Sequence, residues 1–128
     1  MTGHQRPRVL IADDDAGIRT AVSKLLSLSC DVVGTVVDIA ALFEAVQRLR
    51  PDVVLLDFSL RGELTSLEAC NRITTTIPEV KIVVFTAHDD DDLRAAAFEA
   101  GASGFVWKPQ VAEQLLRTIQ DVAGRPAG

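Results

Sequence analysis

Tyrosine is absent from this chain of 128 residues, tryptophan occurs once and phenylalanine five times. The interior of the folded protein must therefore be mainly aliphatic. Hydrophobic residues still make up 48% of the sequence and charged residues 24%, a balance typical of globular proteins rather than disordered ones. A chain of this length can bury about two-thirds of its unfolded surface, so we predict a single domain with a sizeable core.

Clustered positive charge is also missing. The chain has 13 Lys and Arg against 18 Asp and Glu, a formal net charge of −5, and its basic residues are scattered. A surface that binds the phosphate backbone of DNA or RNA needs grouped basic residues. We therefore expect no direct nucleic-acid binding by this domain.

Cysteine and histidine are scarce. Cys30 and Cys70 are too few for a disulfide framework and too far apart for a CxxC metal site, and His4 and His88 have no second ligand nearby. We interpret both cysteines as small buried apolar groups in a reducing compartment. The apolar run at 9–12 is too short for a signal peptide or a membrane span. These features predict a cytoplasmic protein without membrane contact.

Short apolar runs alternate with stretches of helical periodicity. Several runs are continuously apolar, which is typical of parallel strands covered on both faces. Between the runs, apolar residues recur at helical spacing, as at Ile18, Val22 and Leu25. The alternation predicts an α/β fold, a doubly wound (βα)5 domain with right-handed crossovers. The predicted strands are 9–12, 32–37, 53–56, 80–85 and 104–107.

Helix start and stop signals agree with this division. Asp38 and the capping-box sequence 65–68 mark helix starts, and Gly101 and Gly124 mark helix ends. The chain then divides into three parts: a disordered N-terminal arm (1–7), the domain (8–123), and a C-terminal tail or truncated linker (124–128).

Polar side chains follow four of the five predicted strands. Asp13–Asp15, Asp57, Thr86 and Lys108 come where these strands end. In open parallel sheets, ligands bind beyond the carboxyl ends of the strands, so we expect these groups to form one site. Asp52, at the other end of the third strand, would lie about 16 Å from Asp57 and is interpreted as a surface residue.

The predicted cluster carries excess negative charge. Asp13, Asp14 and Asp57, if about 5 Å apart, would repel pairwise by roughly 3 kcal/mol, and Lys108 offsets only one of the three charges. A divalent cation balances the rest, and oxygen-only ligands favour Mg²⁺ or Mn²⁺ over zinc. A phosphoryl group is the natural guest, because metal, Lys and the Thr86 hydroxyl can stabilise its oxygens while a carboxylate accepts it covalently.

Four segments, 9–14, 52–57, 83–87 and 101–109, resemble in order and placement the receiver domain of bacterial two-component response regulators. The likeness spans nearly the whole chain. It implies a flavodoxin-like five-stranded parallel sheet in the order 2-1-3-4-5. It also implies that Asp57 accepts a phosphoryl group from a phosphohistidine of a sensor histidine kinase or phosphotransfer protein.

The resemblance also assigns roles within the site. Asp13, Asp14, Asp57 and the backbone carbonyl of Ser59 would hold Mg²⁺ or Mn²⁺, and Lys108 would act with Asp57 in catalysis. Such a domain is not an enzyme in the ordinary sense, since at most it catalyses its own phosphorylation and dephosphorylation.

A switch is implied as well. Thr86 would move toward the phosphoryl group and Phe105 would turn inward, by steric packing alone because Phe lacks the hydroxyl of Tyr. The face built by the fourth helix, fifth strand and fifth helix would carry the message and is a candidate homodimer contact. Ser59 and His88 would border the path of the attacking water and modulate dephosphorylation.

The sequence departs from the family after the acceptor. Receivers commonly read Met-Pro and then reach a Gly, whereas the stretch 60–66 is one residue longer and lacks that proline. The geometry of this loop therefore stays open. The peptide bond before Pro109 is usually cis in the family, and the sequence permits this.

Two other functions remain open. A haloacid-dehalogenase-type phosphatase is suggested by Asp13 and Asp15, which satisfy its Asp-x-Asp signature, but only Glu113 and Asp121 follow Lys108 where that class needs an acidic pair. A degenerate receiver would signal by protein contact alone. Neither GxxxxGK nor GxGxxG occurs, so nucleotide binding has no support.

Overall fold

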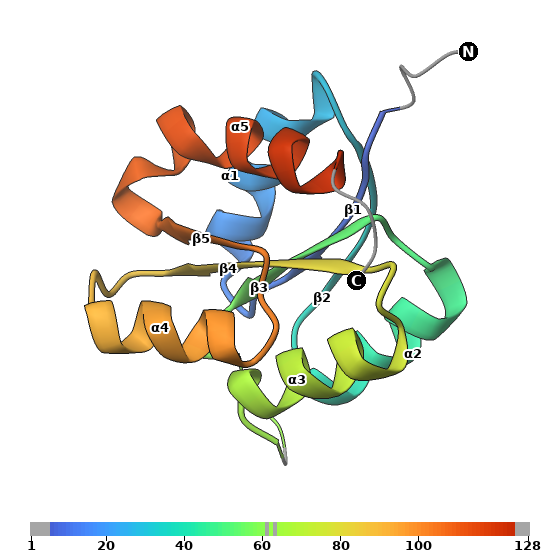
Figure 1. The fold of residues 1–128 in the computed structure, drawn as a ribbon. Helices are drawn as coiled ribbons and strands as arrows, with labels where there is room; N and C mark the ends of the chain where they lie inside the picture. The colour runs from blue at the N-terminus through green and yellow to red at the C-terminus, as the bar shows by residue number, and fades with distance from the viewer. Residues whose placement is uncertain (1–5, 61, 63, 125–128) are drawn as a thin grey trace.

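A computed structural model describes residues 6–60, 62 and 64–124, in which strands and helices alternate along the chain (Figure 1). The strands are β1 (Arg8–Ala12), β2 (Asp31–Val36), β3 (Val53–Asp57), β4 (Lys81–Thr86) and β5 (Gly104–Trp107). The helices are α1 (Ala16–Ser27), α2 (Ile39–Leu49), α3 (Ser66–Thr76), α4 (Asp91–Glu99) and α5 (Val111–Ala123), with a 3₁₀ turn, η1 (Lys108–Gln110). All strand pairs are parallel, in the order β2-β1-β3-β4-β5, which confirms the predicted fold class.

Helices cover both faces of the sheet (Figure 1). α1 and α5 lie on one face, and α2, α3 and α4 lie on the other. Side chains alternate between the faces along each strand, so Leu10 and Val54 join the core under α2 and α3, whereas Ile11 and Leu55 join the core under α1 and α5. Every residue of β3 is buried, which explains its continuously apolar run.

The two cores contain few aromatic and sulfur-bearing side chains. Phe85 and Phe105 are the aromatic residues buried in the described part of the chain, and the other buried apolar residues are nearly all aliphatic. Cys30 and Cys70 are free and buried, as predicted. Burial raises the pKa of the Cys70 thiol to about 12, so it stays protonated and behaves as a small apolar group.

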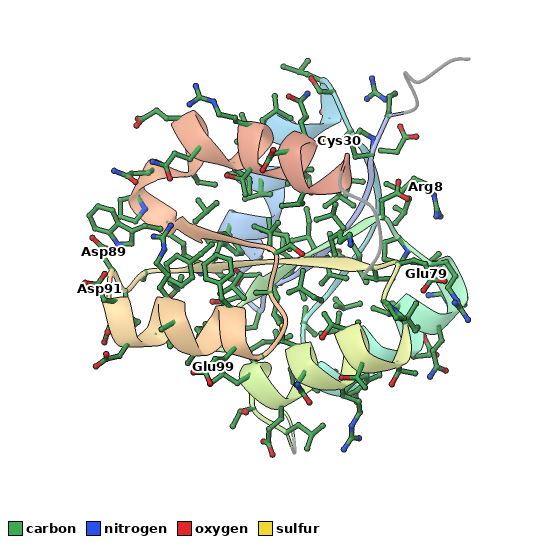
Figure 2. All side chains as sticks on the ribbon, viewed as in Figure 1. Arg8, Cys30, Glu79, Asp89, Asp91 and Glu99 are labelled. Carbon is green, nitrogen blue, oxygen red and sulfur yellow. The ribbon has the colours of Figure 1, made fainter. Side chains whose placement is uncertain are left out.

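Side-chain caps begin the helices at the predicted positions. Asp38 accepts a hydrogen bond from the Ala41 amide, and Thr65 and Glu68 form a complete capping box. At the start of α4, Asp90 accepts from two amides of the first turn. The rest of its acidic run lies in solvent, with Asp89 and Asp91 extending outward in Figure 2.

The start of β1 is held by hydrogen bonds of Arg8 and Arg6. Asp52 accepts from the Arg8 amide at 2.8 Å, so this exposed carboxylate fixes the strand entrance as well as facing solvent. The Arg6 guanidinium donates to Asp31 at 3.0 Å and to the carbonyl of Ser27 at 2.6 Å. The predicted arm and tail fall largely outside the described residues, and the domain boundaries stay a prediction.

α4 ends in a Schellman motif. The amide of Gly101 donates to the carbonyl of Phe98, and the amide of Ala102 donates to the carbonyl of Ala97, both at 3.0 Å. Gly101 has φ of 107°, in the left-handed region that glycine tolerates best. A Cβ at this position would also collide with the Thr74 hydroxyl of α3.

We expect Gly101→Ala to lower the free energy of unfolding by about 1–3 kcal/mol, since the new methyl group meets both backbone strain and Thr74. Urea unfolding followed by circular dichroism measures this loss. Gly124→Ala is the matched control, because its Cβ would meet its nearest atoms at 3.7 Å and its φ is −83°. Equal stability of the two variants would contradict the prediction.

Candidate functional site

Strand register brings the predicted polar residues to one edge of the sheet. Ala12 pairs with Leu56 across β1 and β3, so Asp13 and Asp57, each one residue further on, emerge side by side. Thr86 ends β4 opposite Trp107 of β5, so Lys108 follows at the same level. The carboxyl ends of four neighbouring strands therefore deliver their polar groups to a common site.

Asp13, Asp14 and Asp57 form a cluster able to hold a metal ion. Each offers one carboxylate oxygen, and these oxygens lie within 4.8 Å of one another. Asp13 is 0% and Asp57 2% exposed, whereas Asp14 lies in solvent. The cluster thus has a buried floor and an open side. Its all-oxygen donor set fits Mg²⁺ or Mn²⁺, which keep waters and accept phosphate oxygens at their remaining positions.

Lys108 joins the two buried carboxylates. Its Nζ lies 3.1 Å from Oδ2 of Asp13 and 3.4 Å from Oδ1 of Asp57, and it sits 4.8 Å from the centre of the Phe85 ring. One ammonium group among three carboxylates leaves a net charge of about −2. Pro109 follows a trans bond, since the described residues contain no cis peptide, unlike the bond usual in receivers.

Burial raises the pKa of Asp13 above its usual value of 3.8. The Asp15 amide, which donates to the carboxylate, lowers it, the negative charge of Asp57 raises it further, and Lys108 lowers it. The net upward shift means that the charged form of Asp13 is disfavoured in the folded protein. Without a cation, the ionised form of Asp13 therefore lowers the stability of the fold.

Both oxygens of the Asp57 carboxylate have donors. Oδ1 accepts from the Ser59 amide at 3.2 Å and Oδ2 accepts from the Ser59 hydroxyl at 2.9 Å. These contacts come from the amide and hydroxyl of Ser59, so a metal-binding role for its backbone carbonyl stays a prediction. A ligand on Oδ2 has to compete with the hydroxyl or share that oxygen with it.

The loop after Asp57 folds back onto the end of β3. The carbonyl of Asp57 accepts from the Leu60 amide and from the hydroxyl of Ser66, both at 3.1 Å. Ser66 is buried at the start of α3, where it ties the helix to the strand end. Within the unusual stretch 60–66, residues 61 and 63 lie outside the described part of the chain.

Thr86 ends β4 at the edge of the sheet that carries the site, whereas Phe105 of β5 lies deeper, opposite Val84, and both are buried. Thr86 is 2% exposed, and its hydroxyl oxygen accepts from the His88 amide at 3.1 Å. The side chain of His88 lies in solvent. Phe105 is 7% exposed and is covered by the Arg94 guanidinium, 5.1 Å from the ring centre. The Phe ring is therefore already inward in this structure, and movement of Thr86 stays a prediction.

Four residues near the site were missed by the sequence reasoning. Ser66 supports Asp57, Arg94 covers Phe105, Trp107 donates through Nε1 to the Ala87 carbonyl at 3.1 Å, and Arg19 donates to the carbonyl of Asp13 at 3.0 Å. Ser66 directly follows a recognisable capping residue, which is a weak signal for its position. The other contacts have no local sequence pattern.

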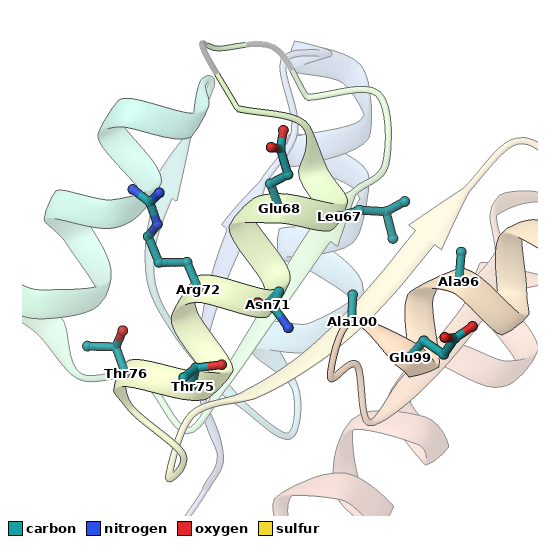
Figure 3. A pocket seen from close by; sticks show the side chains of 9 residues that line it. All are labelled: Leu67, Glu68, Asn71, Arg72, Thr75, Thr76, Ala96, Glu99 and Ala100. Atoms are coloured by element: carbon teal, nitrogen blue, oxygen red, sulfur yellow. The ribbon is translucent and has the colours of Figure 1, made fainter.

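A separate groove of about 690 Å³ lies between α3 and α4 (Figure 3). Glu68 and Arg72 of α3 and Glu99 of α4 contribute charges of both signs to its wall. None of its lining residues belongs to the carboxylate cluster.

Among the helices that the structure describes, none has the length and hydrophobicity of a membrane span.

A family model for the response regulator receiver domain matches residues 9–120. The chain therefore belongs to this family of signalling domains, which confirms the resemblance carried by the strand-end motifs. Oxygen regulatory protein NreC of Staphylococcus aureus is 35% identical over 117 residues, covering 90% of this chain and 54% of NreC. The chain thus spans about half the length of the curated relatives it matches.

Solved receiver structures share the fold. The signal receiver domain of NarL from Mycobacterium tuberculosis superposes with a TM-score of 0.88 at 30% identity, over 94% of this chain and 99% of that one. A LuxR-family two-component response regulator from Aurantimonas sp. SI85-9A1 gives a TM-score of 0.87 at 29% identity, over 97% and 90% of the two chains. Both matches cover more than nine-tenths of this chain.

We expect Asp13→Asn to raise the thermal midpoint at pH 7 by a few degrees without divalent cations, where about 1 kcal/mol corresponds to about 4 °C. The folded protein holds the Asp13 proton to higher pH than the unfolded chain does. Wild-type stability contributed by this group therefore falls as pH rises from 3.8 through the raised pKa, and stays low above it. Asparagine is neutral throughout and lacks this fall.

Thermal unfolding followed by circular dichroism, across a pH series in the presence of a chelator, measures the effect. Asp89→Asn, an exposed position, is the matched control and should leave the pH dependence unchanged. A less stable Asp13→Asn variant at neutral pH would show that the Lys108 contact outweighs burial and repulsion.

Proposed function

We propose that the chain accepts a phosphoryl group on Asp57, with Mg²⁺, from a phosphohistidine of a sensor histidine kinase or phosphotransfer protein. The observation that carries the proposal is the neighbourhood of Asp57. Lys108 lies 3.4 Å from its carboxylate, and carboxylates of Asp13 and Asp14 complete a cluster within 4.8 Å. A buried nucleophile with a cation site and an ammonium group beside it suits phosphoryl transfer.

The chain's own groups divide the work of the transfer. An oxygen of Asp57 attacks phosphorus, the bond from phosphorus to the imidazole nitrogen breaks, and the electron pair returns to the histidine. Lys108 neutralises charge on the phosphoryl oxygens, and the Thr86 hydroxyl donates to one of them. Mg²⁺, held by Asp13, Asp14, Asp57 and the Ser59 carbonyl, would supply charge neutralisation on the incoming phosphoryl group.

Thr86 and Phe105 form the proposed switch. To reach the phosphoryl group, the Thr86 hydroxyl gives up its hydrogen bond from the His88 amide. The loop after β4 moves with it, and Trp107 is tied to that loop through the Ala87 carbonyl. Because Phe105 has no hydroxyl, its part is packing against the space that Thr86 leaves. The conformational change then alters the face formed by α4, β5 and α5, which is also the proposed homodimer contact.

Ser59 and His88 are the proposed modulators of dephosphorylation. The Ser59 hydroxyl lies 2.9 Å from Asp57 Oδ2, and the His88 side chain is exposed two residues after Thr86. We expect both side chains to border the open side of the cluster. Water has to approach the phosphoryl group from solvent, so both side chains can set the rate of hydrolysis.

We further propose that the domain covers 8–123, with an arm at 1–7 and a tail or linker at 124–128. The relatives are about twice as long as the matched region, since that region covers 54% of NreC. In a longer protein of this kind, the α4–β5–α5 face would control the remainder of the chain. Buried, free cysteines accord with action in the reducing cytoplasm.

A phosphatase of the haloacid-dehalogenase type is less well supported. Its signature would need the Asp15 carboxylate at the reaction centre, but Asp15 accepts from the Ile18 amide as the N-cap of α1. Steady release of phosphate from a phosphomonoester would favour that enzyme over a receiver.

We expect stoichiometric phosphorylation of the wild-type protein by acetyl phosphate with Mg²⁺, and complete loss of it in Asp57→Asn. Intact-mass spectrometry measures the added phosphoryl group. Asp52→Asn, at the opposite end of β3, is the matched control and should be labelled normally. Chelation of Mg²⁺ should abolish labelling of the wild type. A label that persists in Asp57→Asn would reject this acceptor, and an unlabelled wild type would point to a receiver acting by contact alone.

Beryllofluoride with Mg²⁺, a stable mimic of the phosphoryl group, should change the fluorescence of Trp107, the single tryptophan of the chain. The expected cause is movement of the Ala87 carbonyl, to which the indole donates. Thr86→Ala removes the hydroxyl that drives this movement, so the fluorescence change should fall at least severalfold. Thr75→Ala, on the exposed surface of α3, is the control. A full response in Thr86→Ala would separate Trp107 from the switch.

A further inference from the structure

Arg19 links α1 to the backbone of the acidic cluster. Its Nη1 donates to the carbonyl oxygen of Asp13 at 3.0 Å, and the side chain is partly buried. The residue lies one turn into α1, and neither the metal cluster nor the proposed phosphoryl contacts include it. Ordering a long charged side chain against a backbone carbonyl costs conformational entropy, so the contact has to contribute a free energy that offsets this cost.

Every polar atom of Asp13 has a partner. Its amide donates to Val36 at 3.1 Å, Oδ1 accepts from the Asp15 amide at 2.9 Å, and Oδ2 lies 3.1 Å from Lys108. Arg19 supplies the fourth contact, at the carbonyl. Asp13 is therefore fixed by hydrogen bonds at its amide, its carbonyl and both carboxylate oxygens. The contact from Arg19 is the one on the carbonyl, in the peptide unit that leads to Asp14.

The Asp13 carbonyl belongs to the same rigid plane as the Asp14 amide. Because the peptide unit is planar, a hydrogen bond that fixes the carbonyl direction also fixes where the Cα of Asp14 lies. Asp14 is exposed, and among the described residues its carboxylate makes no hydrogen bond or ion pair. The direction of the Asp14 carboxylate relative to Asp13 and Asp57 therefore depends on the position of the Asp14 backbone.

We propose that Arg19 is a positioning residue for divalent-cation binding, which holds the peptide plane between Asp13 and Asp14 so that the Asp14 carboxylate faces the cluster. The inference rests on the metal site of the proposed function. Partners that orient metal ligands in this way typically change metal affinity by about 10- to 100-fold when removed.

Charge alone predicts the opposite result. Arg19 is a cation near a cation site, so a purely electrostatic role would make Mg²⁺ bind more tightly once the guanidinium is removed. A positioning role makes Mg²⁺ bind more weakly. The sign of the change in the dissociation constant therefore separates the two.

The test compares Arg19→Ala and Arg19→Lys with wild type by the rise of the thermal midpoint over a MgCl₂ series, without phosphodonor. We expect the Mg²⁺ dissociation constant to rise about tenfold in Arg19→Ala and to be partly restored by Arg19→Lys, which keeps a donor. Arg48→Ala is the matched control, because Arg48 pairs with Glu44 on the exposed surface of α2. Urea unfolding without Mg²⁺ reports any general loss of stability.

A second measurement uses acetyl phosphate. In Arg19→Ala, the Mg²⁺ concentration for half-maximal phosphorylation should rise about tenfold, while the rate at saturating Mg²⁺ returns to that of wild type. Unchanged or tighter Mg²⁺ binding in Arg19→Ala would overturn the inference, as would a rate that stays low at saturating Mg²⁺.

The inference and the proposed function can fail separately. Weaker Mg²⁺ binding in Arg19→Ala supports the positioning role even if the wild type takes up no phosphoryl group, and that second result counts against the proposed function alone. A wild type that binds no Mg²⁺ would overturn both the role of Arg19 and the metal part of the proposed function.

Discussion

Two carboxylates are buried side by side at one end of the parallel sheet, and the rest of the fold has to compensate the electrostatic cost of burying them. Asp13 and Asp57 emerge together because the register of β1 and β3 leaves no alternative. For Asp13, lost hydration and repulsion by Asp57 cost folding energy that the Asp15 amide and Lys108 offset only in part, which raises its pKa. The surrounding aliphatic cores stabilise an arrangement whose excess negative charge a bound divalent cation would neutralise.

Much of the fold followed from the sequence because its signals are local. Continuous aliphatic runs predicted the strands, and polar caps such as Asp38 and Thr65 marked the helix starts where the structure has them. The sheet order came from the family resemblance. Asp52 was only partly understood, because its contact with the Arg8 amide joins positions 44 residues apart and has no local pattern.

The carboxylate cluster and Lys108 could also be predicted, since parallel strands deliver their carboxyl ends to one edge. The supporting contacts could not. Trp107 reaches the Ala87 carbonyl across 20 positions of sequence, and Arg94 reaches Phe105 from a neighbouring element. Such contacts depend on side-chain direction after packing, which composition and periodicity do not contain.

The cover over Phe105 is a guanidinium rather than more hydrocarbon. A contact of this kind near the surface is worth about 0.5–1 kcal/mol, little more than thermal energy. Side chains on the exposed surface change rotamer within nanoseconds, so Arg94 lifts from the ring and returns far faster than helices or loops rearrange. The outer cover of this buried ring is thus a contact that exchanges rapidly, whereas the packing beneath it is permanent.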